Sequence, residues 1–222
     1  MKTLLITGAG KGIGHATALL AAKQGHQVIA LSRNIKALKG IEGIRPYAVD
    51  LAEPKQINFF IKQLDNLQID VLLNNAGVLT NTAVGDSTFD LFEKIYRVNV
   101  FGLAELTRQL LPQMTAKSHV VNISSMGGIQ GSAKFPGLSI YSSSKAAVIT
   151  LTELWAEEFK ENGPRVNALA LGAVQTEMLA KAFPGLQAPV SAKEFGHYVL
   201  DFCLTGHQFY NGKTLQVSSS TP

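Results

Sequence analysis

Short apolar segments alternate with longer amphipathic segments along the whole chain, and this alternation constrains the fold more than any other feature. Several short segments are almost continuous in Val, Leu, Ile and Ala, which is typical of strands buried on both faces. The pattern predicts repeated βαβ units, and therefore a doubly wound α/β fold with a parallel sheet and helices on both faces. The predicted strands are Leu4 to Thr7, Val28 to Leu31, Tyr47 to Val49, Val71 to Leu73, Val120 to Ser124, Val166 to Leu171 and Leu215 to Val217.

The amphipathic segments carry apolar residues at helical spacing, as in Ile13, Ala16, Leu19 and Leu20. Two further series with this spacing are Leu91, Ile95 and Val98, and then Leu103, Leu106 and Leu110. No repeat, linker or break in composition divides the chain, so residues 1–222 are predicted to form one domain.

Composition excludes several classes of protein. The single cysteine among 222 residues forms no internal disulfide, which favours a reducing compartment and a cytoplasmic location. The net charge of +4 is spread along the chain, so no nucleic-acid partner is expected. No apolar stretch approaches the roughly 20 residues of a membrane span. The five histidines show no paired ligand spacing, and no metal site is predicted.

A glycine-rich turn follows the first predicted strand and opens the first helix. Glycines permit the tight turn and let the backbone approach a pyrophosphate, while the N-terminus of the helix faces the anion. The strand, turn and helix context favours a dinucleotide site of the Rossmann type over a turn without a ligand. The candidate cofactor-binding residues in this turn are Gly8, Lys11, Gly12, Ile13 and Gly14.

The end of the second predicted strand indicates which dinucleotide binds. Many dinucleotide folds place an acidic residue here to bind the ribose hydroxyls, whereas this chain has Ser32 and Arg33. A guanidinium suits a 2′-phosphate, and Lys11 supplies a second positive charge. The sequence therefore predicts NADP(H) as the cofactor. The alternative is that Arg33 is an ordinary solvated arginine.

Tyr141 and Lys145 are four residues apart at the start of a predicted helix, and this spacing places them on one face. A tyrosine that acts as an acid or base near neutral pH needs a lowered pKa. An ammonium about 4 Å away would supply roughly 4 kcal/mol at an effective dielectric constant near 20, or about three pKa units. This pair is therefore a candidate catalytic pair.

Taken together, these motifs resemble the short-chain dehydrogenase/reductase family, in its short single-domain branch. Five matches occur in the family's order and span most of the chain. They are the turn Thr7 to Gly14, the Asn-Asn-Ala-Gly sequence of residues 74–77, Asn99, the pair Ser124 and Ser125, and Tyr141 with Lys145.

The resemblance implies a catalytic tetrad of Asn99, Ser125, Tyr141 and Lys145. In such enzymes the tyrosine exchanges a proton with the substrate oxygen, and the serine hydrogen-bonds that oxygen. The lysine holds the nicotinamide ribose and lowers the tyrosine pKa, and the asparagine supports a water. For Asn99 the alternative is a helical asparagine that bonds the backbone. We expect Ser124 only to cap the end of its strand.

The resemblance also implies further cofactor contacts. Asp50 matches the acidic residue that contacts the adenine, and Thr176 matches one that reaches the nicotinamide amide, although an ordinary turn residue is the alternative there. Homodimers or homotetramers are common in the family, through the helix after Tyr141 and the one near Leu106. The remaining predicted cofactor-binding residues are Leu51, Asn75, Ala76, Gly77, Gly172 and Val174.

The chain departs from the family pattern at three places. Ser125 and Tyr141 are separated by 16 positions, a few more than usual, Leu171 stands where proline is common, and residues 212–217 lack the usual Asp-Gly-Gly ending. Two segments rich in Gly and Pro, residues 126–139 and 172–191, read as irregular loops that form walls of the site. Apolar residues in and near them, which favour a small or medium apolar carbonyl, are Leu79, Phe135, Leu138, Met178 and Phe183.

Three functions remain open on the sequence. The first is an NADPH-dependent reductase of a small-molecule carbonyl, or the reverse alcohol dehydrogenase. The second is a catalytically silent nucleotide-binding regulator or scaffold of the same fold. The third is another reaction on this fold, such as epimerisation, although relatives of that kind are usually longer.

Overall fold

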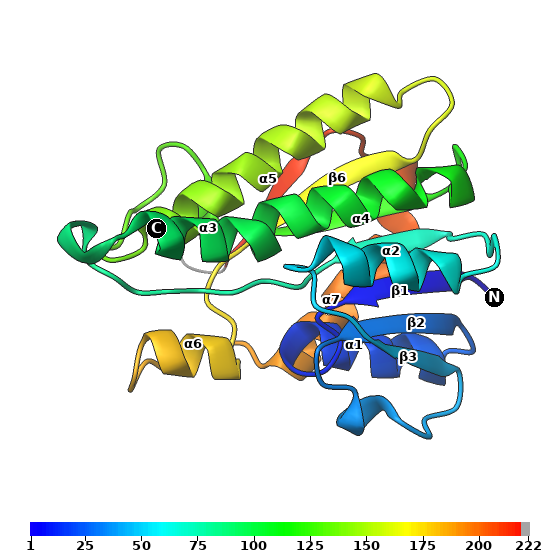
Figure 1. Cartoon of the computed structure of the whole chain (residues 1–222), viewed down its shortest axis with the longest axis horizontal. Coiled ribbons are helices and arrows are strands. Elements are labelled where there is room, and N and C mark those ends of the chain that lie inside the picture. Colours follow the sequence, from blue (N-terminus) through cyan, green and yellow to red (C-terminus); the bar gives the residue numbers. More distant parts are fainter. Residues whose placement is uncertain (219–222) are drawn as a thin grey trace.

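The computed structural model describes residues 1–218, so the last four residues of the predicted domain lie outside the described part. Seven parallel strands form one sheet in the order β3-β2-β1-β4-β5-β6-β7 (Figure 1). All seven predicted strands are confirmed. Their bounds are Thr3–Thr7 (β1), Gln27–Ser32 (β2), Ile44–Ala48 (β3), Val71–Asn74 (β4), His119–Ser125 (β5), Arg165–Leu171 (β6) and Thr214–Val217 (β7).

The third strand shows the largest shift from its predicted position, because it begins at Ile44 rather than Tyr47. Arg45 and Pro46 interrupt the apolar pattern there. In the described sheet β3 pairs only with β2, and a strand with a free edge tolerates a proline that cannot donate a hydrogen bond.

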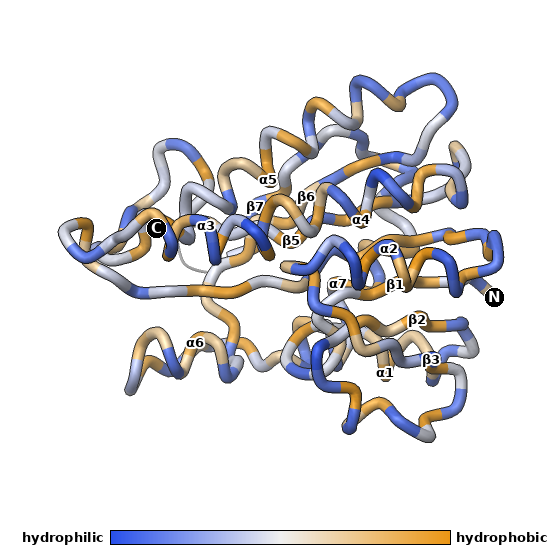
Figure 2. The backbone as a smooth tube through the Cα atoms, in the orientation of Figure 1, coloured by the Kyte–Doolittle hydropathy of each residue, from blue (hydrophilic) through white to orange (hydrophobic). Residues whose placement is uncertain are grey.

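Helices cover both faces of the sheet, and the side chains of β1 show how the two cores divide. Leu4 and Ile6 lie in the core under α1 (Gly12–Lys23) and α7 (Ala192–Thr205), whereas Leu5 lies in the core under α2, α4 and α5. This alternation follows from the two-residue period of a strand. Figure 2 shows the hydrophobic colour concentrated along the central strands. The other helices are Pro54–Lys62 (α2), Phe89–Tyr96 (α3), Leu103–Leu110 (α4), Ser139–Glu158 (α5) and Glu177–Ala182 (α6).

Two local features differ from the sequence prediction. The two amphipathic series after residue 88 form α3 and α4, but a π-helical turn, Arg97–Gly102, joins them into one continuous element. The segment 172–191 is not wholly irregular, because α6 forms inside it. Thr176 caps this helix by accepting a hydrogen bond from the Leu179 amide at 3.2 Å.

The short 3₁₀ segments lie mainly in the connections between these elements. Within the described residues, no helix is long and apolar enough to cross a membrane. The 3₁₀ segments are Lys36–Leu38, Val84–Asp86, Leu111–Gln113, Met126–Gly128 and Gly206–Gln208.

A buried histidine on β5 makes the fold sensitive to acid. His119 is fully buried, its Nδ1 contacts the Cys203 carbonyl oxygen at 3.1 Å, and its Nε2 contacts the Asn167 side-chain amide at 3.0 Å. With the amide donating to Nε2 and Nδ1 donating to the carbonyl, the neutral ring is fully bonded. Burial lowers the pKa of His119 to about 4.

We therefore expect stability to fall as the pH drops from 6.5 towards 4, because the unfolded chain takes up a proton that the folded chain excludes. The loss from this group is about 3 kcal/mol. Urea unfolding at several pH values measures it, with His119→Gln expected to flatten the pH dependence and His197→Gln, at an exposed position, expected to keep it. Equal pH dependence in both variants would contradict the assignment.

Candidate active site

A cavity of about 520 Å³ opens at the carboxyl ends of the strands, beside the point where the strand order reverses between β1 and β4. Ligands of open α/β sheets bind at such a point. Almost all of the predicted site residues line this cavity, and only Gly14 and Asn99 do not. Those that line it are Gly8, Lys11, Gly12, Ile13, Ser32, Arg33, Asp50, Leu51, Asn75, Ala76, Gly77, Ser125, Tyr141, Lys145, Gly172, Val174 and Thr176.

The glycine-rich turn leads from β1 into α1. Gly12 has a φ of +60°, which an L side chain rarely adopts. Gly14 lies behind the cavity, where an added Cβ would stand 2.7 Å from the Gly8 carbonyl oxygen. No side chain caps the N-terminus of α1, and its first turn holds no acidic residue. The backbone amides there are consequently available to an anion.

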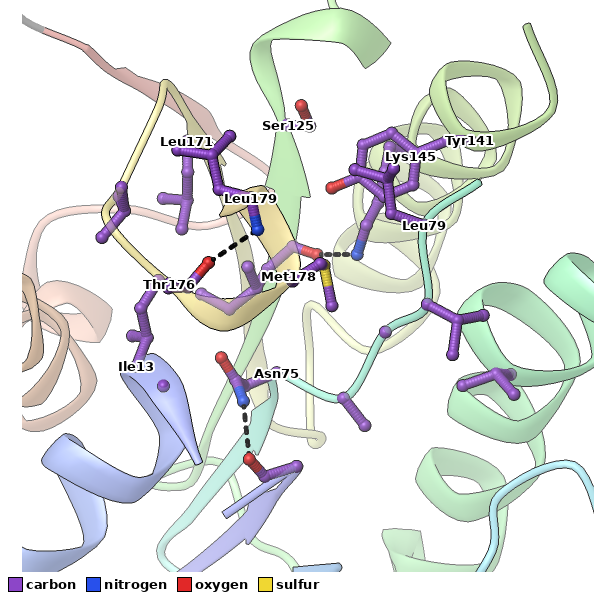
Figure 3. Close-up of a pocket in the computed structure, with 18 of the residues that line it drawn as sticks. Ile13, Asn75, Leu79, Ser125, Tyr141, Lys145, Leu171, Thr176, Met178 and Leu179 are labelled. Carbon is purple, nitrogen blue, oxygen red and sulfur yellow. Dashed lines mark hydrogen bonds between the residues drawn. The ribbon is translucent and has the colours of Figure 1, made fainter. Parts of the chain in front are cut away.

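Thr7, which the sequence analysis did not count among the site residues, fixes the loop after β4. Its hydroxyl accepts hydrogen bonds from the amides of Asn75 at 3.0 Å and Ala76 at 2.9 Å. The Asn75 side chain donates to the Thr7 carbonyl oxygen at 3.0 Å, as Figure 3 shows. These bonds join the glycine-rich turn to the loop on the other side of the cavity.

The two predicted phosphate-binding cations differ in their surroundings. Lys11 is paired with Glu177, at the start of α6, with 3.2 Å between Nζ and Oε2. Its charge is therefore matched within the chain, although Lys11 lines the cavity as predicted. Arg33 is exposed and forms no ion pair with any of the described residues. The free positive charge at this end of the cavity is consequently that of Arg33.

Tyr141 and Ser125 line the same cavity in spite of the longer separation between them. The intervening loop folds back on itself, because the Lys134 ammonium donates to the carbonyl oxygen of Gly127 at 3.0 Å and also to that of Ile129. The extra residues are taken up within the loop, and both hydroxyl-bearing residues still line the cavity.

The pKa of Tyr141 differs from the sequence prediction. Burial raises it to about 12, although the Ser125 hydroxyl opposes the rise. The expected lowering by Lys145 is absent because its ammonium donates to the Ile123 carbonyl oxygen at 2.8 Å and lies 5.9 Å from the centre of the tyrosine ring (Figure 3). Burial also lowers the pKa of Lys145 to about 8, so its ammonium form still prevails at pH 7.

Asn99 lies in the π-helical turn and braces the site from behind. Its Oδ1 accepts from the Val78 amide at 2.8 Å, and its Nδ2 donates to the Val78 carbonyl oxygen at 3.0 Å and to the Ser144 hydroxyl at 2.9 Å. The side chain thus fixes the loop after β4 to the helix that carries Tyr141. This is the backbone-bonding role that the sequence analysis left open as the alternative.

The sequence predicted that Ser124 caps the end of its strand. Its hydroxyl instead donates to the Lys145 carbonyl oxygen at 2.8 Å. Side chains alternate along β5, so Ser124 faces α5 while Ser125 faces the cavity.

A buried chain of polar side chains, which the sequence analysis missed, links β4, β5 and α5. Asn122 donates to Thr152 at 2.9 Å and accepts from Asn74 at 2.9 Å. The signal for this chain is an asparagine within an otherwise apolar strand.

Thr176 combines two roles. It caps α6, as an ordinary turn residue would, and its methyl group lies 3.6 Å from the position of an added Cβ on Gly12. It therefore holds the start of α6 against the glycine-rich turn. The residues that follow cover the cavity with apolar side chains, namely Met178, Leu179, Phe183 and Leu186.

Comparison with known proteins agrees with this arrangement. A family model described as short chain dehydrogenase matches residues 2–187. 3-Oxoacyl-(acyl-carrier-protein) reductase FabG of Thermotoga maritima is 35% identical over 192 residues, which cover 81% of this chain and 77% of that protein. Dehydrogenase/reductase SDR family member 6 of Danio rerio is 34% identical over 199 residues, which cover 87% and 80%.

Solved structures share the whole fold. One titled 4-hydroxyisoleucine dehydrogenase, complexed with NADH, superposes with a TM-score of 0.87 at 26% identity and covers 99% of this chain and 98% of its own. A short chain dehydrogenase from Burkholderia cenocepacia, in complex with NADP, reaches a TM-score of 0.87 at 23% identity, with 99% and 97% covered, and shows the fold alone.

The sheet order, the site at its reversal point and the family match define a Rossmann-type oxidoreductase. The chain belongs to the short-chain dehydrogenase/reductase family.

Proposed function

We propose that this protein is an NADP(H)-dependent oxidoreductase that transfers a hydride between the nicotinamide and a carbonyl or alcohol substrate, with Tyr141 as the acid and base. The observation that carries this proposal is that Tyr141, Ser125 and Lys145 line one cavity, with Ser125 close enough to lower the pKa of Tyr141 against the effect of burial. The proton donor Tyr141, the orienting hydroxyl of Ser125 and the cation Lys145 thus lie together at one end of the cavity, and the other end of the cavity suits a nucleotide.

The residues present fit a nicotinamide dinucleotide. The uncapped N-terminus of α1 suits the pyrophosphate, and Asp50, which follows β3 and lines the cavity, would contact the adenine. When bound, the cofactor supplies or accepts the hydride. The cavity walls formed by α6 and the loop after β4 would shield this transfer from water.

The chain's own residues then handle the proton. In reduction, the Tyr141 hydroxyl donates its proton to the carbonyl oxygen while Ser125 donates a hydrogen bond to the same oxygen. A tyrosine whose pKa is about 12 is fully protonated at neutral pH and so is ready to donate. The resulting phenolate needs a nearby positive charge, which Lys145 provides if its ammonium turns from the Ile123 carbonyl towards the phenol.

Lys145 in that position would stabilise the Tyr141 phenolate strongly. An ammonium about 4 Å from the phenol oxygen stabilises the phenolate by roughly 4 kcal/mol, or about three pKa units. That would bring the pKa of Tyr141 from about 12 to roughly 9. Lys145 therefore offsets the cost of burying the tyrosine, and the site works in both directions of the reaction.

The preference for NADP(H) rests on Arg33. It is an exposed cation that lines the cavity at the end of β2 without an ion-pair partner among residues 1–218, and Ser32 beside it carries no charge. An acidic side chain at this position would repel a 2′-phosphate, whereas a guanidinium binds phosphate through two parallel hydrogen bonds.

The proposal is tested by incubating the purified protein with NADPH and a panel of aldehydes, ketones and quinones. We expect NADPH absorbance to fall and the matching alcohol to appear in equal amount for at least one class. Tight NADPH binding without turnover of any carbonyl, and without NADP-linked oxidation of any alcohol, would favour the silent scaffold instead.

A further inference from the structure

Among residues 1–218, the charged side chains that line the cavity belong to its nucleotide end, apart from Lys145. Arg33 and Asp50 follow β2 and β3, and Lys11 precedes α1, so these three lie on the β1 side of the reversal point, away from β5, which carries Ser125. Glu177 begins α6, and its carboxylate pairs with the Lys11 ammonium. The fifth charge, on Lys145, already has the Ile123 carbonyl oxygen as a partner at 2.8 Å.

The end of the cavity around Tyr141 is apolar. Leu79 and Met178, both labelled in Figure 3, line the cavity together with Tyr141. The side chains that complete this substrate region come from the β5–α5 loop and from the segment around α6, and none of them carries a charge. The apolar residues of the region are Leu79, Phe135, Leu138, Met178, Phe183 and Leu186.

The cation beside Phe135 in the sequence, which lies outside the lining, is occupied. Lys134 precedes Phe135, but its ammonium donates to the Gly127 and Ile129 carbonyl oxygens and to the Ser132 hydroxyl. Those three partners satisfy the three donors of an ammonium group. Lys134 thus serves the fold of its loop and leaves no donor for a substrate anion.

Hydrogen bonds among the three segments show that the substrate region is a built feature. The Thr82 amide, in the loop after β4, donates to the Gly137 carbonyl oxygen at 2.8 Å. From the same loop, the Asn81 side chain donates to the Ala182 carbonyl oxygen at the end of α6 at 3.2 Å. At the rim, Phe135 and Leu186 are 59% and 46% exposed, so the apolar surface continues outward from the tyrosine.

We propose that the substrate is an aldehyde or ketone with an uncharged, apolar chain, and that the same region selects against carboxylated carbonyl compounds. This inference rests on the proposed function, because it concerns the substrate of the same site. An apolar chain gains from burial against the six side chains. A carboxylate there would lose its hydration and find no cation among the six side chains that line the region.

The test compares two aldehydes of equal length, heptanal and the analogue in which a carboxylate replaces its terminal methyl group. We expect kcat/KM with NADPH to be at least roughly 100-fold higher for heptanal, since an unpaired buried carboxylate is strongly disfavoured. Equal values, or a preference for the carboxylate, would overturn the inference while leaving the proposed oxidoreductase in place. Absence of turnover with every carbonyl would instead count against the proposed function itself.

A binding measurement separates recognition from turnover. With the NADP-loaded protein, heptanol is expected to raise the Tm, and the matching hydroxy acid is expected to leave it unchanged. An equal rise with both compounds would contradict the apolar assignment.

A charge placed in the substrate region should reverse the preference. Leu79 is partly exposed, so an arginine can be accommodated there. Leu79→Arg is expected to raise kcat/KM for the carboxylated aldehyde by about tenfold and to lower it for heptanal, and Leu79→Met is the size-matched control. If Leu79→Arg left the ratio of the two substrates unchanged, the substrate chain would not lie against Leu79.

Discussion

Tyr141→Phe is expected to lower kcat for NADPH-linked carbonyl reduction by roughly 10²- to 10⁴-fold, which is the usual contribution of a positioned acid. The change removes one oxygen atom from a residue at the start of α5 and keeps the ring that packs there. NADPH affinity should therefore stay close to that of the unmodified protein. Steady-state kinetics gives the first quantity, and titration of NADPH fluorescence gives the second.

Two further variants make the result specific. Ser125→Ala removes the partner hydroxyl and is expected to lower kcat as well, whereas Tyr198→Phe alters a tyrosine on α7 outside the cavity and should change nothing. Full activity of Tyr141→Phe would rule out Tyr141 as the proton donor. A silent scaffold would show equally negligible turnover in all of these proteins.

Arg33→Asp is expected to reverse the cofactor preference. It removes the free cation at the end of β2 and puts a carboxylate beside the place of the 2′-phosphate. A charge-assisted hydrogen bond contributes roughly 1.5–3 kcal/mol, and like-charge repulsion adds to the loss. We expect the ratio of NADPH to NADH affinity to fall by roughly 100-fold or more, since each 1.4 kcal/mol corresponds to about tenfold.

The control for this variant is Lys36→Asp, which makes the same change of charge on an exposed residue near Arg33 but outside the cavity lining. It should shift the ratio only slightly, because water and salt screen exposed charges. Competition between the two cofactors in a fluorescence titration gives the ratio of NADPH to NADH affinity for each variant. An unchanged ratio in Arg33→Asp would mean that Arg33 is an ordinary solvated arginine.

Much of the fold could be predicted because its signal is local. A strand buried on both faces is mostly apolar, as β1, β2 and β4 are, whereas Arg45 and Pro46 shorten the signal in the edge strand β3. The π-helical turn at Arg97–Gly102 could not be predicted, because one extra residue in a turn barely disturbs helical spacing. The helix α6 was hidden because Gly172 precedes its short sequence and Pro184 and Gly185 follow it.

The residues of the candidate site could be predicted from the sequence, but the groups that their side chains bond could not. Spacing could place Tyr141 and Lys145 on one helical face, yet it could not show that the Lys145 ammonium would bond the Ile123 carbonyl oxygen. Nor could it show that Glu177, 166 positions away, would pair with Lys11. Both bonds depend on how distant segments pack.

The pKa of Tyr141 illustrates the same limit. The sequence argument included the attraction of an ammonium, which lowers the pKa, but not the burial that raises it to about 12. Burial depends on the whole cavity wall, from the loop after β4 to α6, and on no short motif. The two effects are of comparable size, so the state of the tyrosine follows from the position of Lys145.

The central claim is that this cavity transfers a hydride between NADP(H) and a carbonyl carbon. The most direct measurement uses NADPH deuterated at the transferable position, together with heptanal, and analyses the alcohol by mass spectrometry. We predict one deuterium on the carbinol carbon of every product molecule, and at most about a hundredth as much of this product with Tyr141→Phe in the same time. Alcohol without deuterium, or no alcohol from any carbonyl tested, would contradict the claim.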